Sequence, residues 1–130
     1  MSTRTNLRPQ PVITAGDMST TLTSKPTILQ SLSGCSYGYS WTGTSPVGAL
    51  SVQVSDDYAL EPTGTVLNAG TWTTLIVSQN GTPTSSVPIS GNTGTAFIDI
   101  TKTMAYAIRT IYTPVSGTGS LNATVNGKVS

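Results

Sequence analysis

Apolar and polar side chains alternate along much of this chain with a period of two residues. The apolar faces of the three clearest segments consist of Tyr37, Tyr39 and Trp41; Leu50, Val52 and Val54; and Leu121, Ala123 and Val125. Successive side chains of a β-strand point to opposite sides of the sheet, so each segment predicts a strand with one buried face. We find no apolar stripe with the helical period of 3.6 residues.

Clusters of Gly, Pro, Asn and Ser separate these segments. We expect a turn at Gly43–Gly48 that joins two antiparallel strands, and a second turn around Asn80-Gly81. Pro114 should end the strand before it, with a glycine turn at Ser116–Gly119. About eight short strands at this spacing predict an all-β fold, a two-sheet antiparallel β-sandwich. The periodicity leaves open whether it is jelly-roll-like or immunoglobulin-like.

The first sixteen residues differ from the rest, and we predict an extended N-terminal arm at 1–16 before a β-sandwich domain at 17–130. Pro9 and Pro11 exclude a regular helix and favour extended backbone. The arm has two readings, a frayed terminus or a segment that docks on a neighbouring subunit. If the arm docks on a neighbouring subunit, the predicted interface residues are Arg4, Arg8, Pro11, Val12 and Ile13.

The composition is poor in reactive groups. The chain has no histidine, one cysteine, five acidic and six basic residues, while serine and threonine supply about a third of it. Without histidine a Cys–His nucleophile pair cannot form, and we expect Cys35 to be buried and inert. We therefore predict no catalytic residues, no bound cofactor and no enzymatic activity.

The charge pattern and the length of the apolar runs argue against two classes of partner. The net charge is +1, and the basic residues are spread from Arg4 to Lys128 without a stripe. A nucleic-acid interface needs clustered cations, so we expect none. No apolar run approaches the ~18–20 residues that span a bilayer, so we expect no membrane contact either.

One loop holds three of the five acids and is the candidate ligand site: Asp56, Asp57, Tyr58 and Glu61. Carboxylates in a loop can hold calcium, although the EF-hand spacing is absent and we predict no metal. Asp residues in turns ordinarily bond to their own backbone, which is the plain alternative. A third hypothesis is a carbohydrate site, in which an exposed Tyr58 stacks on a sugar and the two aspartates form hydrogen bonds to it.

Arg109 is a charge within an otherwise apolar strand. It either faces outward and protects an edge, or forms an ion pair. Because a buried ion needs a partner, the second reading pairs Arg109 with Asp56, Asp57 or Asp99.

Three stretches together resemble a known class of proteins. They are Trp41-Thr-Gly-Thr-Ser-Pro-Val-Gly-Ala-Leu-Ser-Val-Gln-Val-Ser-Asp-Asp57, Thr71-Trp-Thr-Thr-Leu75, and Tyr106-Ala-Ile-Arg-Thr-Ile-Tyr-Thr-Pro-Val-Ser-Gly-Thr-Gly-Ser-Leu-Asn-Ala-Thr-Val-Asn-Gly-Lys128. Their order and spacing, across roughly residues 35–128, resemble the small β-sandwich structural proteins of bacteriophages. Members of that class are capsid decoration, minor capsid, spike or tail-associated proteins.

The resemblance implies a phage virion protein, made in the bacterial host cytoplasm and most simply a capsid-associated decoration or minor capsid subunit. The implied partners are other virion proteins, the major capsid protein first, and copies of itself. Faces rich in Ser and Thr suit close protein–protein contacts, since few charges must be desolvated. The alternative is a carbohydrate-binding or receptor-binding module of a phage spike or tail.

Overall fold

The alternating segments form twelve β-strands in the part of the chain that the structure, a computed structural model, describes. That part is the backbone of residues 6–29, 34–79, 82–100 and 106–128, with the side chains of all but 6–8, 78, 79 and 128. The strands are β1 (Asn6–Asp17), β2 (Leu22–Thr23), β3 (Thr27–Ile28), β4 (Gly34–Ser55), β5 (Ala59–Leu60), β6 (Val66–Asn68), β7 (Thr73–Thr74), β8 (Val77–Gln79), β9 (Thr82–Thr84), β10 (Val87–Ser90), β11 (Thr93–Ile100) and β12 (Ala107–Lys128). No helix that could cross a membrane occurs among these residues.

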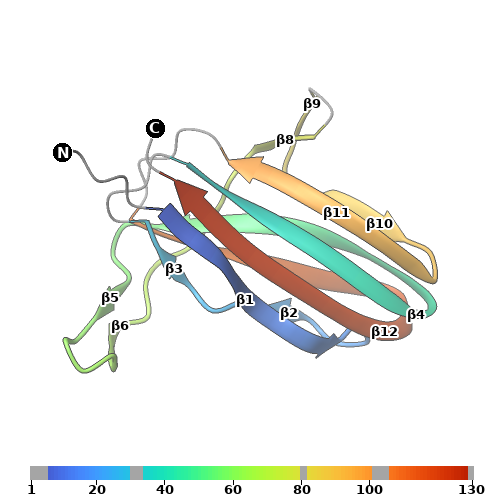
Figure 1. Cartoon of the computed structure of the whole chain (residues 1–130), viewed down its shortest axis with the longest axis horizontal. Coiled ribbons are helices and arrows are strands. Elements are labelled where there is room, and N and C mark those ends of the chain that lie inside the picture. Colours follow the sequence, from blue (N-terminus) through green and yellow to red (C-terminus); the bar gives the residue numbers. More distant parts are fainter. Residues whose placement is uncertain (1–5, 30–33, 80–81, 101–105, 129–130) are drawn as a thin grey trace.

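The two longest strands, β4 and β12, hold the fold together. Each has 22 residues, and they pair antiparallel from Gly34↔Lys128 to Ser55↔Ala107. Figure 1 shows that both strands fold back at the same end of the molecule, so that each contributes to two layers. The expected antiparallel β-sandwich is confirmed, and its two layers are halves of one hydrogen-bonded sheet.

Shorter strands complete each layer. One layer has the order β1–β12–β4–β11, continued by β8 and β9. In the other layer β2 and β3 pair with the first half of β12, while β7 and β10 pair with the second half of β4. Strands β5 and β6 form a separate two-stranded sheet, which projects from the sandwich (Figure 1).

The bend in β4 and β12 lies where the sequence predicted two turns. Segment 43–48 of β4 faces segment 114–119 of β12, and the register shifts twice between Pro114 and Thr118. The expected turn at Gly43–Gly48 is therefore wrong as a hairpin, because the segments on either side of it belong to one strand and both pair with β12. The same correction applies to the turn at Ser116–Gly119. The turn expected at Asn80-Gly81 lies outside the described residues.

Two glycines permit the bend. Gly117 has a φ of 80°, a left-handed conformation, and a Cβ there would overlap the carbonyl oxygen of Ser45. A Cβ on Gly43 would overlap the carbonyl oxygen of Thr118. Ser45 itself has a φ of 48°, and its N–H donates to Asn92 Oδ1 at 2.8 Å. The bend thus brings two backbones closer than side chains would allow.

The core lies between the two layers and uses the predicted apolar faces. Tyr37, Tyr39 and Trp41 are buried, as are Leu121, Ala123 and Val125, while Val54 is half-buried beside buried Leu50 and Val52. A hydrogen bond crosses the core where Tyr39 Oη lies 2.6 Å from Thr110 Oγ1. Because the Thr110 hydroxyl donates to Ser51 O at 2.9 Å, Tyr39 is the donor. The layers are therefore joined by polar as well as apolar contacts.

The predicted boundary between arm and sandwich needs correction. Residues 6–17 are extended, as expected, but they form β1 and pair with β12 of the same chain from Asn6↔Lys128 to Asp17↔Ser120. The sheet thus already includes the described residues from Asn6 onward, which the prediction had assigned to the arm. Three register irregularities interrupt the pairing, and Ala15 adopts a φ of 49°.

We predict that Gly117→Ala lowers the free energy of unfolding more than Gly64→Ala does. Gly64 also has a positive φ, of 91°, but nothing lies within 4 Å of a Cβ placed there. The Gly64 variant therefore reports backbone strain alone, about 1–2 kcal/mol. The Gly117 variant adds the overlap with Ser45, for a total of about 2–4 kcal/mol. Urea unfolding measures both, and equal losses would contradict this account of the bend.

Candidate functional site

The loop singled out in the sequence connects β4 to the projecting hairpin, by which we mean β5, β6 and the turn between them, residues 59–68. Ser55, the last residue of β4, is buried although polar. Its hydroxyl donates to Asp57 Oδ1 at 2.7 Å and accepts the N–H groups of Asp57 at 3.3 Å and Tyr58 at 3.2 Å. The loop is thus folded onto the end of the strand.

Asp57 joins the two ends of the hairpin. Its Oδ1 also accepts the N–H of Thr71 at 2.6 Å, from the segment that follows β6. The hydrogen bonds from the Thr71 backbone and the Ser55 hydroxyl favour the charged carboxylate and hold the pKa of Asp57 below its usual value. This carboxylate therefore stabilises the loop, which agrees with the alternative prediction that an aspartate in a turn bonds to nearby backbone.

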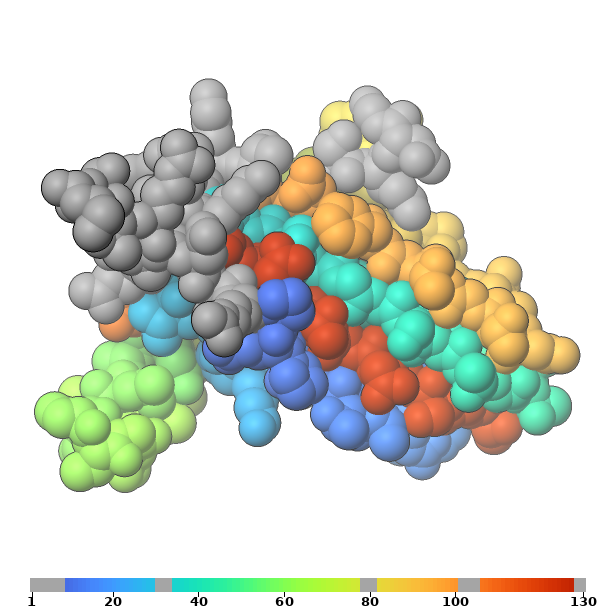
Figure 2. Space-filling model, in the orientation of Figure 1, coloured from blue at the N-terminus to red at the C-terminus, as the bar shows by residue number. Residues whose placement is uncertain are grey.

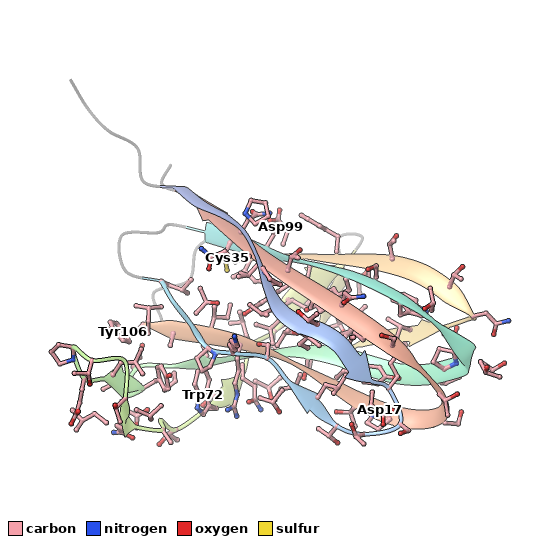
Figure 3. The ribbon with its side chains drawn as sticks, turned by 60° about the horizontal axis from the view of Figure 1, so that its bottom comes forward. Asp17, Cys35, Trp72, Asp99 and Tyr106 are labelled. Atoms are coloured by element: carbon pink, nitrogen blue, oxygen red, sulfur yellow. The ribbon has the colours of Figure 1, made fainter. Side chains whose placement is uncertain are left out.

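Aromatic rings pack beneath the same loop. Tyr58 is only 8% exposed, and its ring centroid lies 5.7 Å from that of Trp72. Trp72 Nε1 donates to Ala69 O at 2.8 Å, just after β6. Figure 3 shows Trp72 where the hairpin meets the sandwich. The expected exposure of Tyr58 is wrong, because Trp72, fourteen residues further along the chain, covers its ring.

Arg109 completes this arrangement from β12. Its guanidinium lies 4.2 Å from the centroid of the Trp72 ring, and its Nε donates to Gln53 Oε1 at 2.9 Å. These are a cation–π contact and a hydrogen bond to a neutral amide rather than the ion pair expected with Asp56, Asp57 or Asp99. We call Ser55, Asp57, Tyr58, Trp72 and Arg109 the hairpin base, since together they fix the hairpin to the sandwich.

The remaining acids of the loop do not converge on a ligand. Asp56 is exposed, and its Oδ1 accepts the N–H of Tyr106 at 3.1 Å. Glu61 is exposed in the hairpin turn, where its N–H donates to Thr65 O. Among the described residues no three acidic or cysteine side chains come together as metal ligands.

A hollow of about 410 Å³ lies beside the two aspartates. It is lined by Val54, Ser55, Asp56, Asp57, Thr71 and Thr73. None of these described lining residues is aromatic, so they provide no ring on which a sugar could stack. The expected arrangement of Tyr58 with both aspartates around a carbohydrate is therefore not formed.

The projecting hairpin carries a feature that the sequence analysis missed. Leu60, Val66 and Leu67 are 41%, 52% and 67% exposed, and Glu61 is the hairpin's one ionisable side chain. Figure 2 shows this lobe standing clear of the body at the lower left. The signal in the sequence was the Val66-Leu67 pair, which follows a Pro- and Gly-containing turn without alternating polar partners. Apolar side chains on a projecting element are typical of a protein contact.

The proposed arm residues are divided between surface and core. Pro11 is exposed, Val12 is half-buried, and Ile13 belongs to the core. Arg4 lies outside the described residues, and of Arg8 only the backbone, within β1, is described. Ile13 therefore packs inside the sandwich of its own chain, and of the described side chains among the five, Pro11 is the most exposed.

Cys35 is buried, as expected. Burial, with a smaller effect of the nearby Asp99 carboxylate, raises the pKa of its thiol to about 11. The two residues lie close together in Figure 3. The thiol is therefore protonated at neutral pH and is a poor nucleophile.

Comparison with known proteins gives one solved structure of the same fold. No family model matches the sequence, and no curated protein sequence matches it. The crystal structure of the SPBc2 prophage-derived protein YomS matches with a TM-score of 0.61, over 97% of this chain and 96% of that one. The two sequences are 11% identical, so the likeness is one of fold.

We predict that Asp57 stabilises the protein in a pH-dependent way. A pKa held low by folding adds stability above the pKa of unfolded aspartate, about 3.9, and that stability is lost as the pH falls through the lower folded value. Asp57→Asn keeps an acceptor oxygen but has no charge to titrate. Urea unfolding should show the wild type losing its advantage over this variant below about pH 4.

The comparison with Asp57→Asn cancels the titration of Asp17, whose pKa is also lowered, by hydrogen bonds from Ser19. A difference between the two proteins that stays constant with pH would contradict the assigned role of Asp57.

Proposed function

We propose that this chain is a structural protein of a bacteriophage particle, attached to the capsid as a decoration or minor capsid subunit. It acts through protein–protein contacts rather than through catalysis. Its partners are the major capsid protein and copies of itself, and it is made in the cytoplasm of the bacterial host. The observation that carries the proposal is the projecting hairpin, a rigidly held element that offers apolar side chains to a partner.

The hairpin is held well enough to serve as a contact. An isolated two-stranded sheet is marginal in water. Here the hairpin base fixes one end of the hairpin. Asp57 accepts a hydrogen bond from the Thr71 N–H, and Trp72 donates one to Ala69 O. A preorganised contact loses less conformational entropy on binding, so more of the apolar burial contributes to affinity.

Two other observations support the phage origin. The solved neighbour YomS is a prophage-derived protein, although its likeness to this chain is one of fold. The segments that resemble phage structural proteins, such as 106–128, form the continuous strands of the sandwich. A carbohydrate-binding role has less support, because Tyr58 is buried and none of the described residues that line the hollow beside the aspartates is aromatic.

The test is whether the chain is a stoichiometric part of purified particles. Particles from a host that carries the gene should contain the protein at a fixed ratio to the major capsid protein, measured by quantitative mass spectrometry. A chain that is abundant in the lysate but absent from purified particles would overturn the proposal.

We predict that Leu60→Ser with Leu67→Ser lowers the amount of protein in particles at least about tenfold. Each exposed leucine that becomes buried in a contact contributes roughly 1.5 kcal/mol, and about 1.4 kcal/mol corresponds to tenfold in affinity. The matched control is Val115→Ser, since Val115 is 75% exposed but lies at the bend. Unfolding curves should be unchanged for both. Equal incorporation of the two variants would exclude the hairpin as the contact.

A further inference from the structure

Among the described residues, one edge of the sandwich is open along most of strand β11. β11 pairs with β4 over all eight of its residues, from Thr93↔Thr42 to Ile100↔Cys35. On its other side it pairs with β8 only at Asp99↔Ser78. In an antiparallel sheet alternate residues direct their N–H and C=O groups to each side. Along 93–98 the outward groups therefore have no strand partner among the described residues (Figure 1).

The other described edges of this ten-stranded sheet carry features that prevent edge-to-edge pairing. β1 has Pro9 and Pro11 and three register irregularities, β9 has Pro83, and β10 has Pro88. β2, β3 and β7 are two residues each. β11 has neither proline nor lysine, and its pairing with β4 runs without a register shift. An unprotected, regular edge is a template for another strand, so its retention marks an interface.

The surroundings of β11 suit a second strand. Phe97 is 61% exposed on the outer face, and aromatic side chains are enriched at protein interfaces. A groove of about 780 Å³ runs between β11 and β10, with Trp41, Val87 and Ile89 among its lining residues. A strand added to β11 would cover the open side of this groove.

We infer that the added strand is β11 of a second copy, paired antiparallel about a twofold axis at Thr95. β8 occupies the edge at Asp99, which confines an added strand to 93–98. Centring the pair on Thr95 uses Thr93–Phe97 and stops short of that obstruction. This register places Phe97 opposite the partner's Thr93, a favourable aromatic and β-branched pair.

Charge also favours self-pairing. Asp99 is the one ionisable side chain of β11, and it lies outside the paired segment. No like charges therefore meet when the strand pairs with itself, and the contact is isologous, as twofold dimers require. The inference rests on the proposed function, which includes contacts between copies of this chain, because it assigns one such contact to β11. The geometry of the edge does not depend on a phage origin.

The β11 pairing is tested by charged substitutions at Thr95, where the proposed twofold axis passes. Thr95 is exposed and does not line the core, so Thr95→Lys and Thr95→Glu should both fold, as unfolding curves will check. Each variant alone brings like charges opposite each other and should raise the dimer dissociation constant at least about tenfold. An equimolar mixture of the two should recover the dimer. Light scattering reads the mass against 13.4 kDa for one chain.

A disulfide tests the register independently of the charges. Paired Cα atoms of antiparallel strands lie about 4.5–5.5 Å apart, within the range that a disulfide spans. Thr95→Cys should therefore cross-link two chains under oxidising conditions, read on a non-reducing gel. The matched control Thr93→Cys should not, since it would face the partner's Phe97. Cys35 is buried and common to both.

The outcomes distinguish this inference from the proposed function. A wild-type protein that stays at the mass of one chain at high concentration overturns the β11 pairing, as does a dimer that Thr95→Lys leaves intact. Neither result affects the presence of the chain in particles, which tests the proposed function. A chain that is absent from particles but dimerises through Thr95 would overturn the proposed function and support the β11 pairing.

Discussion

The rest of the structure depends on the pairing of β4 with β12 through a common bend. Two 22-residue strands pair from one end to the other, with two register shifts at the bend, so both layers of the sandwich come from the same two strands. A bend in only one of them would break the pairing and leave backbone groups without partners in the core. The glycines at 43 and 117 allow the close approach that the bend needs.

This constraint explains which parts of the fold the sequence could predict. The alternation in 37–41, 50–54 and 121–125 identified buried faces correctly, because a period of two is a local property of a strand. The turns at 43–48 and 116–119 were misread as hairpin turns. Gly, Pro and Ser suit a hairpin and a strand bend equally, and only the pairing of the two segments, roughly 70 residues apart, distinguishes them.

The candidate site shows the same limit at the level of side chains. Composition correctly drew attention to the loop at 56–61, but the use of its groups depends on residues far along the chain. Asp57 bonds to Thr71, and Tyr58 is covered by Trp72, which Arg109 contacts in turn. Together these contacts fix the hairpin to the sandwich. The boundary of the predicted arm needs correction for a similar reason, since the extended backbone at 6–17 pairs with its own sheet.

The sandwich carries the two surfaces that we propose as contacts. The projecting hairpin has exposed apolar side chains at one end, while the β11 edge has no strand partner along 93–98 among the described residues (Figure 1). The proposed role as a structural subunit needs these contacts at fixed relative positions, and the pairing of β4 with β12 across both layers links them. The most direct measurement is native-state hydrogen exchange of the amides in 34–44 and 49–55. We expect both halves of β4 to exchange only through global unfolding, with the same free energy. A lower free energy for one half would mean that the layers open separately, and would contradict the account.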